Sequence, residues 1–424
     1  MKHALALLWL TACGGAALVP QDPTRVVELD EMRVVAGRQG DELVFDSYDA
    51  GELFARATEH LNDGQCREAV EVYERLVREF ETSRYVSASL YNAGLCLQEA
   101  GELEAAAGFF ERLLERGEEG TDARHAALQL TQALVGLERW EQGLAVSERV
   151  LLREDLSTTE RLEALARRAQ ALLGLSRLED AARQAREAMT FYRTRRGAEV
   201  IDEPYFAAAA NFVLAETLRL RSEAMVVPEA DAPTQHQILD RRAALLLEAQ
   251  REYFNTIRLT EPHWASAAGY RIGSMYETLW HALMSAPIPP PSRPLAAASL
   301  PVYREEYRAE LGRHVRPLLR HAIRYWELTL MMAERTSARS EWAERTRTDL
   351  ERMRDLLLRE EQGPTTPSQL LTPPGQQPQT LPRVPEALLE RPALPAALPP
   401  FAGPGPSRSA SMGSRLTARS HQRT

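Results

Sequence analysis

Four segments between residues 61 and 189 repeat one arrangement of small and apolar residues. In each, a turn precedes an apolar residue, and a small residue follows three places later; the small residues are spaced 37, 37 and 38 positions apart, at Ala69, Ala106, Gly143 and Ala181. A second small column lies twelve places upstream, at Ala57, Gly94, Thr131 and Ala169. The apolar column is Cys66, Leu103, Trp140 and Leu178.

The two small columns indicate pairs of helices that cross closely, because two helices approach only where both carry small side chains. From Asp49 to Arg359 the helix formers Ala, Leu, Glu and Arg dominate, and apolar residues recur at intervals of three and four. One hairpin leaves apolar faces uncovered, so the next must stack on it. The pattern predicts an all-α solenoid of helical hairpins; a bundle with coincidental spacing is the alternative.

The segments resemble tetratricopeptide (TPR) repeats lengthened by three or four residues. The matching residues are Tyr73 and Phe110 at the aromatic place of the second helix, and Gly64 and Gly101 at the turn. The third and fourth repeats depart from the family there, with Ser147 and Ala185. On this resemblance residues 50–195 are regular repeats and residues 196–360 are divergent TPR-like hairpins, which gives a TPR-type α-solenoid of about six hairpins.

The resemblance also implies a concave groove lined by the first helix of each hairpin. The family's groove positions fall on a mixture of aromatic, aliphatic and amide residues: Phe54, Thr58, Tyr91, Leu95, Gln98, Leu128, Gln132 and Gln170. Such a mixture suits an extended peptide or a partner helix. The alternative is that some of these side chains merely pack or face water.

The N-terminal sequence is typical of an export and anchoring signal. Lys2 precedes a short apolar run, Ala4 to Leu10, which is too short to span a bilayer. The sequence Leu10-Thr11-Ala12-Cys13 resembles the lipobox of bacterial lipoproteins, which implies a signal peptide over residues 1–12 and a lipid on Cys13. The alternative is an ordinary signal peptide with an incidental cysteine.

Within that resemblance, the absence of Asp after Cys13 implies the outer membrane, with the protein facing the periplasm or, less favoured, the cell surface. Residues 13–49 are expected to form a tether with a short hairpin. After Glu361 the chain is rich in Pro, Gln, Thr, Ser and Ala, and from Pro404 only arginines carry charge. Residues 361–424 are therefore expected to be a disordered tail.

Cys66 and Cys96 are the remaining cysteines. An exported protein folds in an oxidising compartment, which favours a disulfide. Cys66 begins a second helix and Cys96 lies late in the next first helix, so antiparallel stacking can bring them together. The alternative is two buried free thiols.

Composition excludes several kinds of chemistry. Lys2 is the only lysine, so the mature chain lacks phosphate-loop and Schiff-base lysines. A net charge of −9 gives no electrostatic case for nucleic acid. His314 and His321 share a helix face ringed by arginines, which favours a basic surface over a metal site. No catalytic residue, cofactor, metal or small-molecule substrate is predicted, and no carboxyl group is marked as buried with a raised pKa.

These features favour a non-enzymatic scaffold, held at the outer membrane by lipid, that recruits envelope proteins or peptides for assembly, secretion or motility. A cell-wall enzyme or accessory factor built on the solenoid is a second hypothesis, and a buried, unpaired carboxylate in a deep pocket would favour it. A third is a structural spacer whose arginine-bearing tail touches an acidic envelope polymer.

Overall fold

The computed structural model describes residues 31–362 except 40–41, 118–119, 199–200, 202–203, 293 and 337–339, and also residues 381 and 386–389. The predictions for the signal peptide, for Cys13 and for most of the tail lie outside the described residues. None of the helices in the described part combines the length and apolar character that a bilayer span requires.

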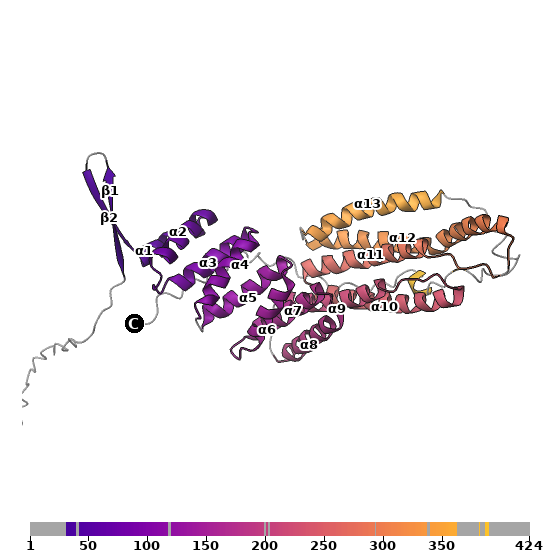
Figure 1. Ribbon diagram of the computed structural model, residues 1–424, viewed down its shortest axis with the longest axis horizontal. Helices are drawn as coiled ribbons and strands as arrows, with labels where there is room; N and C mark the ends of the chain where they lie inside the picture. The colour runs from indigo at the N-terminus through magenta and orange to yellow at the C-terminus, as the bar shows by residue number, and fades with distance from the viewer. Residues whose placement is uncertain are drawn as a thin grey trace, which may run out of the picture.

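The described chain is an all-α solenoid of six hairpins and a closing helix, as predicted (Figure 1). The first three hairpins pair α1 (Ala50–Asn62) with α2 (Cys66–Glu79), α3 (Val86–Glu99) with α4 (Leu103–Glu115), and α5 (Thr121–Gly136) with α6 (Trp140–Leu151). The next three pair α7 (Thr158–Gly174) with α8 (Leu178–Arg196), α9 (Tyr205–Glu223) with α10 (Ala232–Arg258), and α11 (Pro262–Ser285) with α12 (Leu300–Thr336). The helix α13 (Glu341–Glu361) packs on α11 and α12.

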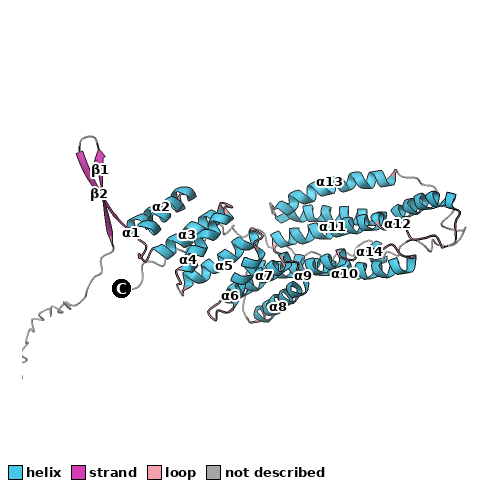
Figure 2. Ribbon diagram, viewed as in Figure 1, coloured by secondary structure: helices cyan, strands magenta, loops and turns pink. Residues whose placement is uncertain are grey.

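The first helices of successive hairpins lie next to one another: α3 contacts α5, α5 contacts α7, α7 contacts α9 and α9 contacts α11. Each second helix packs against its own first helix and the next one. The first helices therefore form one layer of contacts and the second helices pack between them. Figure 2 shows the helical hairpins following one another along the long axis of the molecule.

The small residues lie at the helix crossings, as the periodicity predicts. Ala57, Ala69, Ala106, Ala169 and Ala181 are fully buried. A methyl group on Gly94 would collide with the ring of Phe110 on the partner helix. The apolar column has a simple structural meaning, because its four residues are the first residues of α2, α4, α6 and α8.

The four regular turns share one backbone conformation. Gly64 and Gly101 have positive φ angles of 74° and 83°. Glu138 and Ser176 occupy the equivalent places with φ of 58° and 57°. In each turn the next residue donates its N–H to a carbonyl five positions back, for example Gln65 to His60 at 2.8 Å, which closes the first helix.

The predicted disulfide is present between Cys66 and Cys96, whose Cα atoms are 5.7 Å apart. Cys66 is the first residue of α2, and Cys96 lies in the last turn of α3. The bond links the first hairpin to the second, because α2 and α3 are neighbours in the stack.

A two-stranded antiparallel hairpin precedes the solenoid, with β1 (Met32–Gln39) paired to β2 (Glu42–Asp49). Its base is fixed to the end of α2: Arg33 donates to the Glu79 carbonyl at 3.0 Å, and the Tyr48 hydroxyl donates to the Glu79 carboxylate at 2.6 Å. The Asp49 side chain then caps α1 by accepting from the Glu52 N–H. The hairpin thus extends the solenoid at its N-terminal end (Figure 1).

The divergent half uses the same crossing rule with larger side chains. Gly273 on α11 faces the buried Trp326 on α12, and a methyl group there would lie 2.3 Å from the indole nitrogen. Pro317 lies inside the continuous helix α12.

Part of the predicted disordered tail returns to the solenoid. The four-residue helix α14 (Glu386–Leu389) places Leu388 in the core, and Leu381 is also buried. His236 on α10 binds the Leu381 carbonyl at 2.7 Å, and His321 on α12 binds the Leu389 carbonyl at 3.2 Å. Apolar side chains spaced among prolines are sufficient for this docking, although composition alone predicts disorder.

Candidate functional site

The first helices present a row of aromatic and amide side chains, and the predicted groove residues lie along it. On α1 the ring of Phe54 is half-buried and stacks on Tyr85 with 5.1 Å between ring centres. Thr58, one turn later, lies 3.2 Å from the Tyr73 hydroxyl, which also accepts from Asn92 on α3 at 3.3 Å. Aromatic and polar groups from two hairpins therefore meet at this end of the row.

Three predicted glutamines continue the row on α3, α5 and α7. Gln98 donates its amide N–H to Gln129 at 2.8 Å, and its own amide oxygen is buried without a hydrogen-bond partner in the described part of the chain. The Gln170 amide oxygen is likewise buried and without a partner there, and Gln132 is half-buried between them.

The remaining three predicted residues contribute to packing. Leu128 is 4% exposed and Tyr91 is 8% exposed, and both lie in the core of the N-terminal half. Leu95 is half-buried and packs against the same core. Leu128 and Tyr91 thus match the alternative, in which some of these side chains merely pack.

The surroundings of Tyr91 shift the pKa of its phenol. Burial raises the pKa of its phenol to about 12, and the negative charges of Asp122 and Glu163 act in the same direction, against a hydrogen bond with Gln129. The phenol therefore stays protonated at neutral pH.

Glu163 on α7 is a residue that the sequence does not single out. Its side chain is 14% exposed, and burial raises its pKa to about 7, although the nearby Arg167 guanidinium acts to lower it. The Arg167 Nε atom is 3.8 Å away and has no hydrogen-bond partner in the described chain. Nothing in the sequence marks Glu163 as a buried carboxyl group with a raised pKa.

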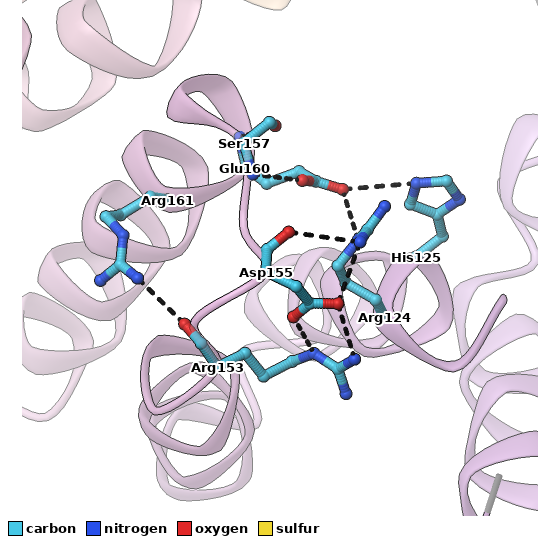
Figure 3. Close-up of polar contacts among 7 residues, drawn as sticks. All are labelled: Arg124, His125, Arg153, Asp155, Ser157, Glu160 and Arg161. Atoms are coloured by element: carbon cyan, nitrogen blue, oxygen red, sulfur yellow. Dashed lines mark hydrogen bonds and ion pairs between the residues drawn. The ribbon is translucent and has the colours of Figure 1, made fainter. Parts of the chain in front are cut away.

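A separate network fixes the loop between α6 and α7 against α5 (Figure 3). Arg124 binds Glu160 at 2.9 Å and Asp155 at 3.1 Å, and His125 binds Glu160 at 3.3 Å. Arg153 donates two hydrogen bonds from its guanidinium nitrogens to the Asp155 carboxylate, at 2.9 and 3.0 Å. The side-chain hydrogen bonds of Arg153, and then Arg124, lower the pKa of Asp155 to about 2.

Ser157 and Glu160 complete this network as a capping box at the start of α7. Burial acts to raise the pKa of Glu160, but hydrogen bonds from Ser157 and the charges of Arg124 and His125 hold it below its usual value. In Figure 3 both carboxylates, Asp155 and Glu160, pair with basic side chains, and Arg161 donates to the Arg153 carbonyl, so the network fixes the loop between α6 and α7.

Sequence reasoning missed Tyr85, Gln129, Glu163 and Arg167. Glu163 and Arg167 are four residues apart on α7, a spacing that is ordinary on a solvated helix face. Glu163 and His125 occupy the same position in two repeats, six residues before the small residue of their own first helix. Comparing the repeats position by position would therefore draw attention to Glu163.

The two histidines considered for metal binding lie in different surroundings, and His314 is exposed. His321 is 7% exposed and packs on the ring of Tyr276, so this part of α12 is not the solvated basic face expected. The described residues contain no group of three or more side chains placed to hold a metal ion.

Residues 54–121 match the family model described as tetratricopeptide repeat. No curated protein matches the sequence. Among solved structures, the chain is 16% identical to MamA (41-end) from Desulfovibrio magneticus RS-1, covering 48% of this chain and 95% of that one with a TM-score of 0.32. It is 18% identical to YrrB, a TPR protein with an unusual peptide-binding site, over 46% and 86% with a TM-score of 0.32.

A tetratricopeptide repeat protein from Parabacteroides merdae is 15% identical, over 74% of this chain and 98% of its own, with a TM-score of 0.35. The family match falls on the first two hairpins, where the turn glycines and second-helix aromatics are. These residues carry tetratricopeptide repeats, and the described chain is folded as a TPR-type α-solenoid.

Proposed function

We propose that this protein is a non-enzymatic interaction scaffold, held at the bacterial outer membrane by a lipid on Cys13, whose groove binds an extended segment of an envelope protein. The lipobox-like sequence supports the anchor. The solenoid supports the scaffold role, because stacked hairpins present a long continuous surface.

The observation that carries the binding role is the row of amide groups on α3, α5 and α7. Gln98 and Gln170 each hold an amide oxygen that is buried without a partner in the described chain, and Gln132 lies between them. An extended peptide offers backbone N–H and C=O groups at regular intervals, so it can pair with half-buried amide side chains along this row without requiring one particular sequence. The aromatic pair of Phe54 and Tyr85 offers an apolar contact at the end of the same row.

The anchor is tested by labelling growing cells with an alkyne-bearing palmitate. The wild-type protein should take up the label and sediment with outer membranes, whereas Cys13→Ser should do neither. Wild-type protein that takes up no label but still sediments with the membrane would contradict the lipid anchor. That result would not bear on peptide binding by the groove.

A cell-wall enzyme remains the second candidate, and Glu163 is the observation that favours it. A carboxyl group with a pKa of about 7 suits a general acid. However, Arg167 neighbours it, and the adjacent Glu160 is committed to Arg124 and His125, so a second carboxylate is not available from that residue. Release of soluble muropeptides from purified cell walls, lost in Glu163→Gln, would support this candidate.

A further inference from the structure

The last described element of the chain docks on the solenoid without belonging to a hairpin. It consists of Leu381 and the four-residue helix α14, which together we call the strap. The closing helix α13 already ends the stack at Glu361. The helix α14 contacts α12, and in Figure 2 it lies between α10 and α12. The strap therefore lies on a finished solenoid in the way that a bound peptide would.

Two leucines of the strap, seven residues apart, are buried against the solenoid. Leu388 is fully buried and Leu381 is 7% exposed, and both belong to the core of the C-terminal half. Leu389 is half-buried and packs against the same core. A helix of four residues is not stable alone in water, so the strap gains its conformation from the surface on which it docks. Short leucine-bearing helices that bind other proteins behave in this way.

Two histidines hold the backbone of the strap at its two ends. The Nε2 atom of His236 on α10 lies 2.7 Å from the Leu381 carbonyl oxygen, and that of His321 on α12 lies 3.2 Å from the Leu389 carbonyl oxygen. Because a carbonyl oxygen only accepts, each ring donates from Nε2. Leu389 ends α14, so its carbonyl has no partner within that helix. Both bonds go to backbone atoms, which any segment of this shape would offer.

The surface under the strap is held in place by contacts to the rest of the solenoid. His321 is 7% exposed, and its ring packs on Tyr276 of α11 with 5.4 Å between ring centres. Next to His236, the buried Gln235 amide donates to two loop carbonyls, at 3.0 and 2.9 Å, and so fixes the start of α10. Because none of these contacts involves the strap, the site is preorganised for a ligand.

We propose that this surface of α10 and α12 is a second docking site, for a leucine-bearing helical segment of a partner protein, and that the strap is its internal competitor. The site lies on second helices, whereas the amide row lies on first helices. Residues 363–380 join the strap to α13, and a tether of this kind gives an effective concentration on the order of mM. A partner segment therefore needs two leucines seven residues apart, and a helix end that offers its carbonyl to His321.

The test titrates a fluorescein-labelled peptide of residues 378–392 into the protein. An open variant, Leu381→Asp with Leu388→Asp, vacates the site. The matched control, Leu370→Asp with Leu371→Asp, changes two leucines of the same tail and leaves the strap intact. Fluorescence anisotropy should show one peptide per open-variant chain, bound at least about ten-fold more tightly than by the wild type or the control. The peptide carrying Leu388→Asp should not bind.

Three further substitutions in the open variant locate the contact. His236→Ala should weaken peptide binding about five-fold, because one hydrogen bond is lost. His314→Ala, which removes an exposed histidine from α12, should not change it. Gln98→Ala with Gln132→Ala should also leave it unchanged, because the amide row is a separate site.

Circular dichroism establishes that the open variant is folded, and Leu381→Ala with Leu388→Ala is a milder open variant that keeps the test available if the Asp pair unfolds the protein. A folded open variant that does not bind the peptide would overturn the proposal. Equal binding by the wild type and the open variant would overturn it too, as would binding that survives Leu388→Asp in the peptide. None of these results bears on peptide binding by the first helices.

Discussion

The ring of Phe110 on α4 occupies the space that a side chain on Gly94 of α3 would need: an added Cβ atom would lie 2.6 Å from Phe110 Cε1. Gly94→Ala should therefore lower the free energy of unfolding by about 1–3 kcal/mol, because the ring or the helix must shift. Chemical denaturation followed by circular dichroism measures this loss.

Gly108 on α4 is the matched control. It is also inside a helix, but nothing lies within 4 Å of an added Cβ. Gly108→Ala should leave stability unchanged or raise it by up to about 1 kcal/mol, since alanine favours the helix. Equal losses in both variants would show that the crossing is not where this account places it.

The conformation of the turns predicts that adding a glycine there would stabilise the protein. Glu138 and Ser176 adopt the left-handed conformation that Gly64 and Gly101 adopt in the first two repeats. Glu138→Gly should raise the free energy of unfolding by about 0.5–1 kcal/mol, because the strain of a side chain at positive φ exceeds the added entropy of the unfolded chain. Thermal melting of the two proteins measures the difference.

The reverse change serves as its control. Gly101 has open space around an added Cβ, so Gly101→Ala carries only the backbone cost and should lower stability by about 1 kcal/mol. If Glu138→Gly destabilises the protein as well, the shared turn conformation is wrong.

Removing the disulfide should lower the stability of the first two hairpins in particular. Replacing Cys66 and Cys96 together by alanine should lower stability by about 3–4 kcal/mol in the chain-entropy model, because the bond closes a loop of separation 30. Hydrogen exchange should accelerate in α1 to α4 and change little in α9 to α13. Identical melting of the wild type with and without reductant would argue that the bond does not contribute.

Glu160 predicts a pH-dependent stability. Its pKa is held below the usual carboxyl value in the folded protein, so its contribution is present above about pH 4.5 and is lost as the pH falls through the folded pKa. Glu160→Gln should cost about 1–2 kcal/mol at pH 7, mainly through the lost charge that pairs with Arg124, since glutamine can keep the capping box, and the cost should shrink as the pH falls through the folded pKa.

Glu141, exposed on α6, is the comparison for that measurement. Glu141→Gln should change stability little at either pH, because an isolated surface carboxylate contributes little. A Glu160→Gln loss that is the same at pH 3 and pH 7 would show that ionisation of this carboxyl is not involved.

How far the sequence predicts this structure depends on how each residue is constrained. Crossings such as Ala57 with Ala69 are readable, because only small side chains fit and the period repeats the requirement. The burial of Leu128 is not readable, since it depends on how closely successive hairpins approach. Glu163 is hidden for a different reason: a carboxylate on a helix is normally solvated, and only the surrounding helices bury it. The burial of Leu388 is missed because the prolines in the surrounding sequence suggest disorder.

Selection of random 15-residue peptides against residues 13–424, followed by titration of the best binder, tests the central claim most directly. The account predicts one peptide per chain, binding that is lost when Gln98 and Gln132 are both changed to alanine, and binding that is kept in Gln142→Ala on the outer helix α6. Peptides that bind the groove variant as well as the wild type, or that depend on Gln142, would contradict it.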